Sequence, residues 1–206
     1  MTMRSMVVLV AVLGAGAAHA DASPAFAKVR DAAEALGGLG PFLDKYMGRC
    51  GSVLEGGGDC QRNAETFRRA ANGKKYYMII TEDSAANLSL GGNDGRSDFT
   101  LNLTPFFPGS DSAVTHGAPS KTDANGNPVL PFIAMKGTLP DGWNMAMLAR
   151  QVQARAMRIQ VVFTPLGTWT LPKKGGGTIK GVKARLDAVL VSVGRTGEEI
   201  ALWTGH

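Results

Sequence analysis

The feature that most limits the fold of this chain is a single change in the spacing of its apolar residues, near Lys74. Before that point, apolar residues recur at helical spacing in three segments, and Pro, Gly or Asn-Gly signals mark their ends. These segments span residues 23–36, 40–50 and 60–74. The N-terminal part of the chain is therefore predicted to be helical.

Beyond Lys74 the apolar residues alternate with polar ones, which is typical of half-buried strands. The segment "DFTLNLT" puts Phe99, Leu101 and Leu103 on one face. The segment "MRIQVVFT" does the same with Met157, Ile159, Val161 and Phe163. The sequence therefore predicts an α+β fold that is helical over 21–73 and β-rich over 74–206.

One helical segment, "WNMAMLARQVQARA", interrupts the predicted strands at residues 143–156. Trp143, Met147, Leu148 and Val152 form an apolar stripe on it, which we expect to be core. The predicted order of elements is helices, three strands, one helix and further strands. This order resembles that of an OB-like barrel. A mostly antiparallel open sheet with one inserted helix explains the same order.

The first twenty residues have the pattern of a secretory signal peptide. Arg4 precedes an apolar run over 6–18, and Ala18 and Ala20 form an A-x-A cleavage site. The run is shorter than the ~20 residues that a spanning helix needs. We expect cleavage after Ala20, a secreted or periplasmic location, no transmembrane segment in the mature form, and one domain over 21–206.

The only two cysteines, Cys50 and Cys60, flank the glycine-rich stretch "GSVLEGGGD". An oxidising compartment favours pairing of two lone cysteines, and glycine lets a short loop turn back on itself. A zinc site would need more ligands, and a redox site would need a C-x-x-C motif. We expect a structural disulfide bond between Cys50 and Cys60.

Positive charge is concentrated in the C-terminal third of the chain. Residues 142–197 carry one acid, Asp187, and nine basic residues: Arg150, Arg155, Arg158, Lys173, Lys174, Lys180, Lys183, Arg185 and Arg195. Residues 21–141 carry twelve basic and fourteen acidic residues. A local positive field of this kind can attract an anionic partner.

Three segments carry a resemblance to a known group of proteins: "FLDKYMGRCG", "LTPFFPGSDSAVTHGAPSKTDANGNPVLPF" and "VVFTPLGTWTLPKKGGG". Together with the signal peptide and the two cysteines, they resemble a family of uncharacterised secreted proteins from myxobacteria. The resemblance covers nearly the whole chain. It implies an exported bacterial protein with no assigned activity, and it supplies no site residues.

Histidine-based catalysis in the mature chain would depend on His116, because the other histidine is the terminal His206. A triad would need a serine and an acid from the same loop, Ser110 to Asp123. The candidates there are Ser112 or Ser120 with Asp111 or Asp123. Residues so close in sequence seldom form a triad, and no G-x-S-x-G motif is present. A hydrolase with His116 as base is the alternative hypothesis.

No cofactor or metal is expected. The segment "TDANGNP" starts like a calcium loop, but Pro128 stands where the loop needs glycine. Met145 and Met147 suggest copper, but two residues apart on a helix they point to nearly opposite faces.

The basic segment is the strongest candidate for a binding site. Lys183 and Arg185 share one strand face with Asp187. Val182, Ala184, Leu186, Ala188 and Leu190 are expected on the other face. The candidate ligand-binding residues are Arg158, Lys173, Lys174, Lys183 and Arg185. Because the chain is expected to be exported, the expected partner is an acidic glycan, a lipid head group or an acidic protein, and not nucleic acid. The leading hypothesis is a non-catalytic binding protein of the cell envelope or extracellular space.

Overall fold

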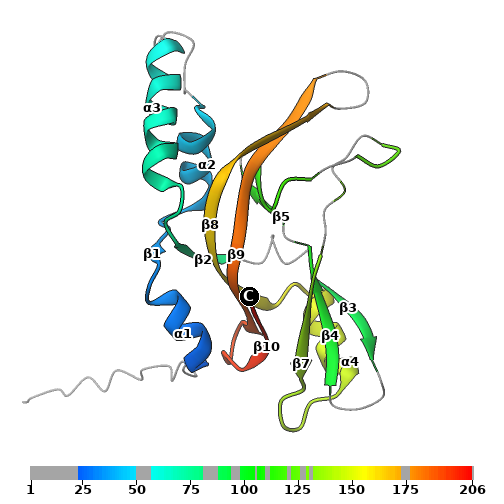
Figure 1. The fold of residues 1–206 in the computed structure, drawn as a ribbon. Helices are drawn as coiled ribbons and strands as arrows, with labels where there is room; N and C mark the ends of the chain where they lie inside the picture. The colour runs from blue at the N-terminus through cyan, green and yellow to red at the C-terminus, as the bar shows by residue number, and fades with distance from the viewer. Residues whose placement is uncertain are drawn as a thin grey trace, which may run out of the picture.

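The computed structural model of the chain describes residues 23–49, 57–80, 88–93, 98–104, 106–109, 112–119, 122–125, 129, 132–172 and 177–205. In chain order the elements are α1 (Pro24–Arg30), β1 (Glu34–Ala35), α2 (Leu39–Met47), α3 (Gly57–Ala71), β2 (Tyr76–Ile80), β3 (Leu88–Asn93), β4 (Asp98–Leu103), β5 (Phe106–Gly109), β6 (Ser112–His116), β7 (Ile133–Thr138), α4 (Met145–Gln153), β8 (Met157–Pro172), β9 (Thr178–Val193) and β10 (Glu199–Thr204). The α+β class with one inserted helix is confirmed (Figure 1).

The described strands form one mostly antiparallel sheet in the order β1-β2-β8-β9-β10-β7-β4-β3. The β5–β6 hairpin joins it because β6 pairs in parallel with β9. The sheet is open: β1 and β3 are the two ends of the order, and among the described residues no pairing joins them. The OB-like barrel is therefore not formed, and the open-sheet alternative is confirmed.

The long hairpin of β8 and β9 forms the centre of the sheet, and it contains two bulges. Val162 pairs with Ala188 while Phe163 pairs with Leu186, so Asp187 is an extra residue in β9. A bulge of this kind bends the strand and shifts the alternation of its side chains.

The bulge at Asp187 corrects one of the sequence predictions. Ala188 and Leu190 do not share a face with Leu186, as the simple alternation predicts. Instead they pack with Phe26 of α1 and Val162. One extra residue reverses the direction of every side chain beyond it.

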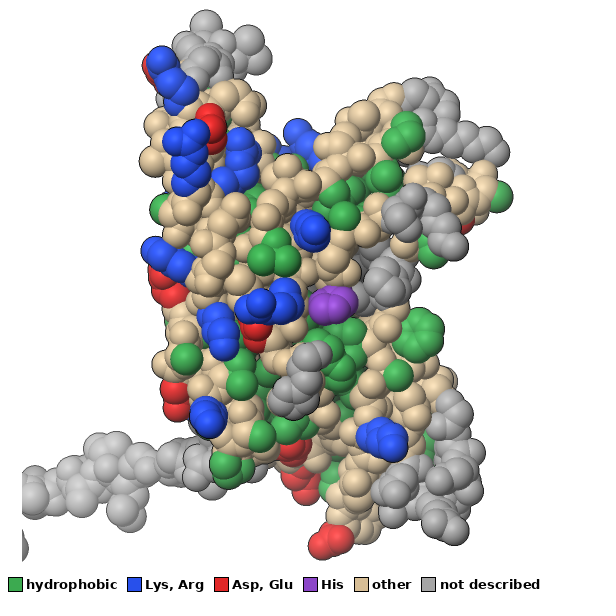
Figure 2. Space-filling model, viewed as in Figure 1, with side chains coloured by type: hydrophobic (Ala, Val, Ile, Leu, Met, Phe, Trp, Pro, Cys, Tyr) green, Lys and Arg blue, Asp and Glu red, His purple; other side chains and the backbone are tan. Residues whose placement is uncertain are grey.

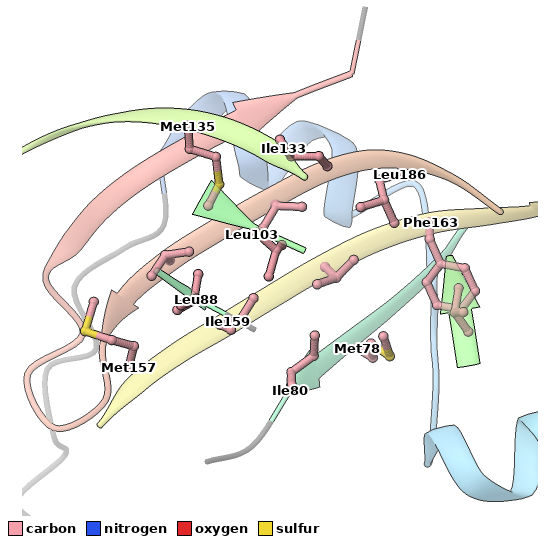
Figure 3. Packing of buried hydrophobic residues seen from close by; sticks show 14 of the residues in the cluster. Met78, Ile80, Leu88, Leu103, Ile133, Met135, Met157, Ile159, Phe163 and Leu186 are labelled. Atoms are coloured by element: carbon pink, nitrogen blue, oxygen red, sulfur yellow. The ribbon is translucent and has the colours of Figure 1, made fainter. Parts of the chain in front are cut away.

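The two faces of the sheet have separate apolar clusters. The larger one, the main core, includes all three predicted residues of β4 and all four of β8. Figure 3 shows part of it, with Met78 of β2, Phe163 of β8 and Met135 of β7 in one cluster. Strands far apart in the sheet order contribute to this cluster because the sheet is strongly bent. We call the face toward the main core the inner face and the opposite face the outer face.

The N-terminal helices cover both faces at one end of the sheet (Figure 1). On the inner face, Phe42 of α2 lies 5.5 Å from Tyr46 and 5.8 Å from Phe163, measured between ring centroids. Burial raises the pKa of Tyr46 to about 12. On the outer face, the fully buried Phe26 anchors α1.

The helix predicted over 23–36 ends at Arg30, earlier than its pattern indicates. Glu34 and Ala35 form a short strand parallel to β2 instead. The backbone N–H of Glu34 donates to the Lys75 carbonyl, and that of Leu36 donates to the Tyr77 carbonyl. Pairing with the sheet edge thus overrides the helix propensity of this segment.

Helix α4 packs on the main core with a face slightly different from the predicted one. Asn144 caps it, because its side chain accepts a hydrogen bond from Met147 N at 3.0 Å. Leu148 is fully buried and Trp143, Met145 and Val152 pack against the core, but Met147 is 40% exposed. The prediction that Met147 is a core residue is therefore wrong. None of the described helices is long and apolar enough to cross a bilayer.

Candidate functional site

The candidate site lies on the outer face of β8 and β9, where Lys183 and Arg185 come before the bulge. Both side chains are exposed, and they alternate with the buried Val182 and Ala184 as the sequence predicts. In Figure 2 the Lys and Arg side chains lie mostly on the left half of the view, from the helices at the upper left to the middle of the molecule.

Arg185 is both exposed and held in place. Its Nε donates to Asp187 Oδ1 at 2.9 Å, and Nη2 donates to Thr164 Oγ1 at 3.4 Å. The Arg185 side chain is 56% exposed, whereas that of Asp187 is 10% exposed. Asp187 is the extra residue of the bulge and lies two residues after Arg185 in the same strand. The other guanidinium N–H groups have no acceptor among the described residues.

Asp187 is fixed in turn by a second contact. Thr164 is buried in β8, opposite Arg185 in the pairing, and its Oγ1 donates to Asp187 Oδ2 at 2.5 Å. The carboxylate therefore accepts from Arg185 in its own strand, β9, and from Thr164 in the neighbouring strand, β8, and it holds the guanidinium in place. It offsets part of the positive charge but leaves the outer edge of the guanidinium open.

The structure adds Lys75 to this group, a residue that the sequence analysis did not select. Lys75 stands two residues before Tyr77, which lies on the outer face. Alternate residues of an extended chain share a face, and β2 pairs with β8 so that the chain before Tyr76 continues beside Thr164. The only sequence signal for this position was its spacing from Tyr77, and that spacing does not identify the neighbouring strand. We call Lys75, Lys183 and Arg185 the basic patch.

Arg158 does not belong to the basic patch. It lies six residues before Thr164 on β8, about 20 Å along the strand, and α1 covers the outer face between them through Phe26. Arg158 instead lies near Tyr77: burial raises the pKa of the Tyr77 hydroxyl, and the charges of Arg158 and Arg30 lower it. That hydroxyl donates to Gln160 Oε1 at 2.6 Å.

Lys173 and Lys174 lie outside the described residues, as does Cys50. Cys60 lies in the first turn of α3, and its Sγ is 3.6 Å from the Gly48 carbonyl oxygen. Gly48 stands two residues before Cys50 in the sequence. The Cys50–Cys60 bond itself stays a prediction.

Trp169 also lies on the outer face, next to the basic patch. Its indole ring covers Gly181, its partner across the β8–β9 pair, so closely that a Cβ on Gly181 would be 2.4 Å from Trp169 Cζ2. The buried Trp169 Nε1–H group has no hydrogen-bond partner among the described residues. Phe163, by contrast, lies in the main core and is not available to a ligand on this face.

His116 is the last residue of β6, at a junction in the sheet. β6 runs parallel to β9, and its last residue pairs with Ala184. β10 runs antiparallel to β9, and its last residue, Thr204, pairs with Ala188. The ends of β6 and β10 therefore meet beside Leu186. His116 Nδ1 accepts a hydrogen bond from Leu186 N at 3.2 Å, and its ring stands edge-on to Trp203 at 6.0 Å.

This contact gives His116 a structural task. A neutral imidazole whose Nδ1 accepts carries its proton on Nε2, whereas a triad base needs an unprotonated Nε2 and donates Nδ1–H to an acid. Asp123 is exposed and bonds to the backbone N–H of Asn125. Ser110, Asp111 and Ser120, and the Ser112 side chain, lie outside what the structure describes. In the part of the chain that is described, no three potential metal ligands cluster.

The whole chain can now be placed among known proteins. Residues 2–206 match a family described as a family of unknown function (DUF6066). The chain belongs to this family. Searches of curated proteins and of solved structures give no match to the chain. Membership in DUF6066 thus covers the helices, the sheet and the basic patch alike, and it assigns none of them an activity.

Proposed function

We propose that this DUF6066 protein is a non-catalytic binding protein, exported to the bacterial cell envelope or the extracellular space. Its basic patch binds an anionic ligand. The observation that carries the proposal is the fixed, open guanidinium of Arg185, held by Asp187 and Thr164 beside the exposed Lys183. A positioned guanidinium loses little side-chain freedom when it binds, so more of the interaction energy remains for the ligand.

The charge of the surrounding chain supports the same ligand class. The nine basic residues and one acid between 142 and 197 give this segment of the chain a net positive charge, which attracts anions. Carboxylates, sulfates and phosphates share the oxygen geometry that a guanidinium recognises. An acidic glycan, a lipid head group and an acidic protein all present such groups.

The alternative, a hydrolase with His116 as base, has less support. Nδ1 of His116 already accepts from a backbone N–H, so no acid orients the ring in the way that a triad requires. The export signal at residues 1–20 lies outside the described part of the chain, and export therefore rests on its sequence pattern.

The test is binding of the wild type and a Lys183→Gln/Arg185→Gln variant to three anionic probes. The probes are phosphatidylglycerol vesicles, an acidic polysaccharide such as polygalacturonate, and poly-glutamate. At low salt we expect the double variant to bind its best probe at least about tenfold more weakly, because each lost charge-assisted bond costs ~1.5–3 kcal/mol. Binding should also fall steeply between low salt and physiological ionic strength.

The matched control is Arg150→Gln/Arg195→Gln, which removes two exposed positive charges from the same segment but outside the basic patch. It should keep most of the binding. Equal losses in both double variants would show that only net charge matters, and no binding of any probe at low salt would exclude the proposed ligand class. The probe that binds most tightly identifies the source of the anion.

A further inference from the structure

A pocket of about 380 Å³ lies at the opposite end of the sheet from the helices α1 to α3, between β3 and α4. Leu88–Leu90 line it from the strand, and Ala149, Val152 and Gln153 line it from the helix together with Arg155. Figure 1 shows α4 beside the part of the sheet formed by β3, β4 and β7. This volume is at the lower end of the range found for ligand sites, roughly 300–1,000 Å³.

The pocket lies along the edge of the strand, and not on one face of the sheet. Successive side chains of a strand point to opposite faces, so a pocket on one face would touch alternate residues. Here three consecutive residues, Leu88, Ser89 and Leu90, all line it. On its other side β3 pairs with β4, and it is the last strand in the sheet order.

An edge of this kind presents backbone N–H and C=O groups that can pair with another extended chain. A peptide added there would gain backbone hydrogen bonds from β3, while apolar side chains would contact Leu88, Leu90 and Val152. Leu88 is buried, and Leu90 and Val152 are partly buried against the main core. The lining thus offers an apolar floor next to a strand edge that pairs with no other strand in the described part of the chain.

Arg155 gives the pocket a charge at one end. It follows α4, is exposed, and forms no ion pair among the described residues. It is also the only described residue other than glycine with a positive φ, 54°. This left-handed residue ends α4: the backbone N–H of Ala156 donates to the Gln151 carbonyl, and that of Arg155 donates to the Val152 carbonyl, as in a common type of helix C-terminus.

From these features we propose that the groove between β3 and α4 binds the carboxyl-terminal end of an extended peptide. The peptide pairs with the free edge of β3, its last apolar side chain enters the pocket, and its terminal carboxylate binds the guanidinium of Arg155. Charge complementarity selects the carboxylate, because Arg155 is the charged residue of the lining. The small volume favours the end of a chain over a segment that passes through. This site is separate from the basic patch and does not depend on it.

The probe is a set of fluorescein-labelled peptides, Gly-Ser-Thr-Val-Thr-X, in which X is alanine, valine, leucine or phenylalanine. Each peptide is made with a free carboxylate and as the amide, and fluorescence anisotropy with the full chain gives the affinities. We expect at least one acid to bind, and its amide to bind at least about tenfold more weakly. In amide NMR spectra, the acid should shift the resonances of Leu88–Leu90.

Arg155→Gly is the most informative variant, because glycine adopts positive φ without cost and the fold should be kept. It should bind acid and amide alike. Gln153→Glu, an exposed change in the lining, should weaken binding of the acid by placing a like charge beside it. Arg150→Gln, an exposed change in α4 outside the lining, is the matched control and should bind the acid normally.

Three results would overturn the proposal: no binding by any of the acids, equal binding of acid and amide by the wild type, or unchanged acid binding in Arg155→Gly. Laurate is included as an apolar carboxylate without a peptide backbone. If laurate shifts the resonances of Leu88–Leu90 and none of the peptides does, the groove binds an amphiphile and the peptide proposal is wrong.

Discussion

The imidazole of His116 takes the place of a missing strand partner. Neither β6 nor β10 extends far enough to pair with Leu186. The Leu186 N–H therefore donates to a side-chain atom, Nδ1 of His116. The neighbouring bonds, from Gly117 N to Ala184 O and from Gly205 N to Asp187 O, complete the junction. A polar residue that the sequence offers as a possible base thus satisfies the backbone of the sheet.

The replacement His116→Leu tests this assignment. It should lower the free energy of unfolding by about 1–3 kcal/mol, because it leaves the partly buried Leu186 N–H without an acceptor. His116→Asn, which keeps an acceptor oxygen, should lose less. Urea unfolding followed by tryptophan fluorescence gives the comparison. A His116→Leu variant as stable as the wild type would show that the hydrogen bond contributes nothing.

Between strands, two glycines are covered by the aromatic ring of the residue paired with them. Gly181 lies under Trp169, and Gly137 lies under Phe99, where a Cβ would be 2.4 Å from Phe99 Cζ. The ring fills the space that a side chain would occupy and packs on the backbone of the neighbouring strand. These pairs fix the register of β8 with β9 and of β4 with β7.

Gly181→Ala should therefore destabilise the protein, by about 1–3 kcal/mol, since the added methyl group forces Trp169 or the strand to move. Gly37→Ala is the control, because Gly37 is exposed, lies outside the helices and strands, and has nothing within 4 Å of an added Cβ. It should change the free energy of unfolding by less than about 0.5 kcal/mol. Thermal unfolding of both variants decides the point, and a neutral Gly181→Ala would mean that the indole ring is not held against Gly181.

Element by element, the sequence predicted what depends on local periodicity. The alternation of Phe99, Leu101 and Leu103 gives the inner face of β4, and the structure confirms it. The bulge at Asp187 could not be seen, because an extra residue leaves the alternation of apolar letters almost unchanged in a segment as rich in valine and leucine as 186–193. The early end of α1 and the membership of Lys75 in the basic patch depend on which strand pairs with β2, and local spacing carries no information on that pairing.

For the molecule as a whole, the loop that links α2 to α3 is expected to be closed by the Cys50–Cys60 bond. The intact mass of protein isolated from the envelope or medium should be lower by two hydrogens than that of the reduced form, and its N-terminus should be Asp21. Reduction should lower the free energy of unfolding by about 3 kcal/mol for a loop of this size. Free thiols or an N-terminal Met1 on the isolated protein would contradict the expectation of an exported, disulfide-bonded protein.

The position of the last three strands at the middle of the sheet governs the order in which the chain can fold during synthesis. β2, β6 and β7 each pair with β8, β9 or β10, which lie between residues 157 and 204. While the ribosome is still adding that segment, the earlier strands can form only hairpins such as β5–β6 and sheets such as β3–β4–β7. Pairing over such long sequence separations is slow and leaves strand edges exposed. The newly made chain therefore cannot complete its sheet until residues 157–204 have been added.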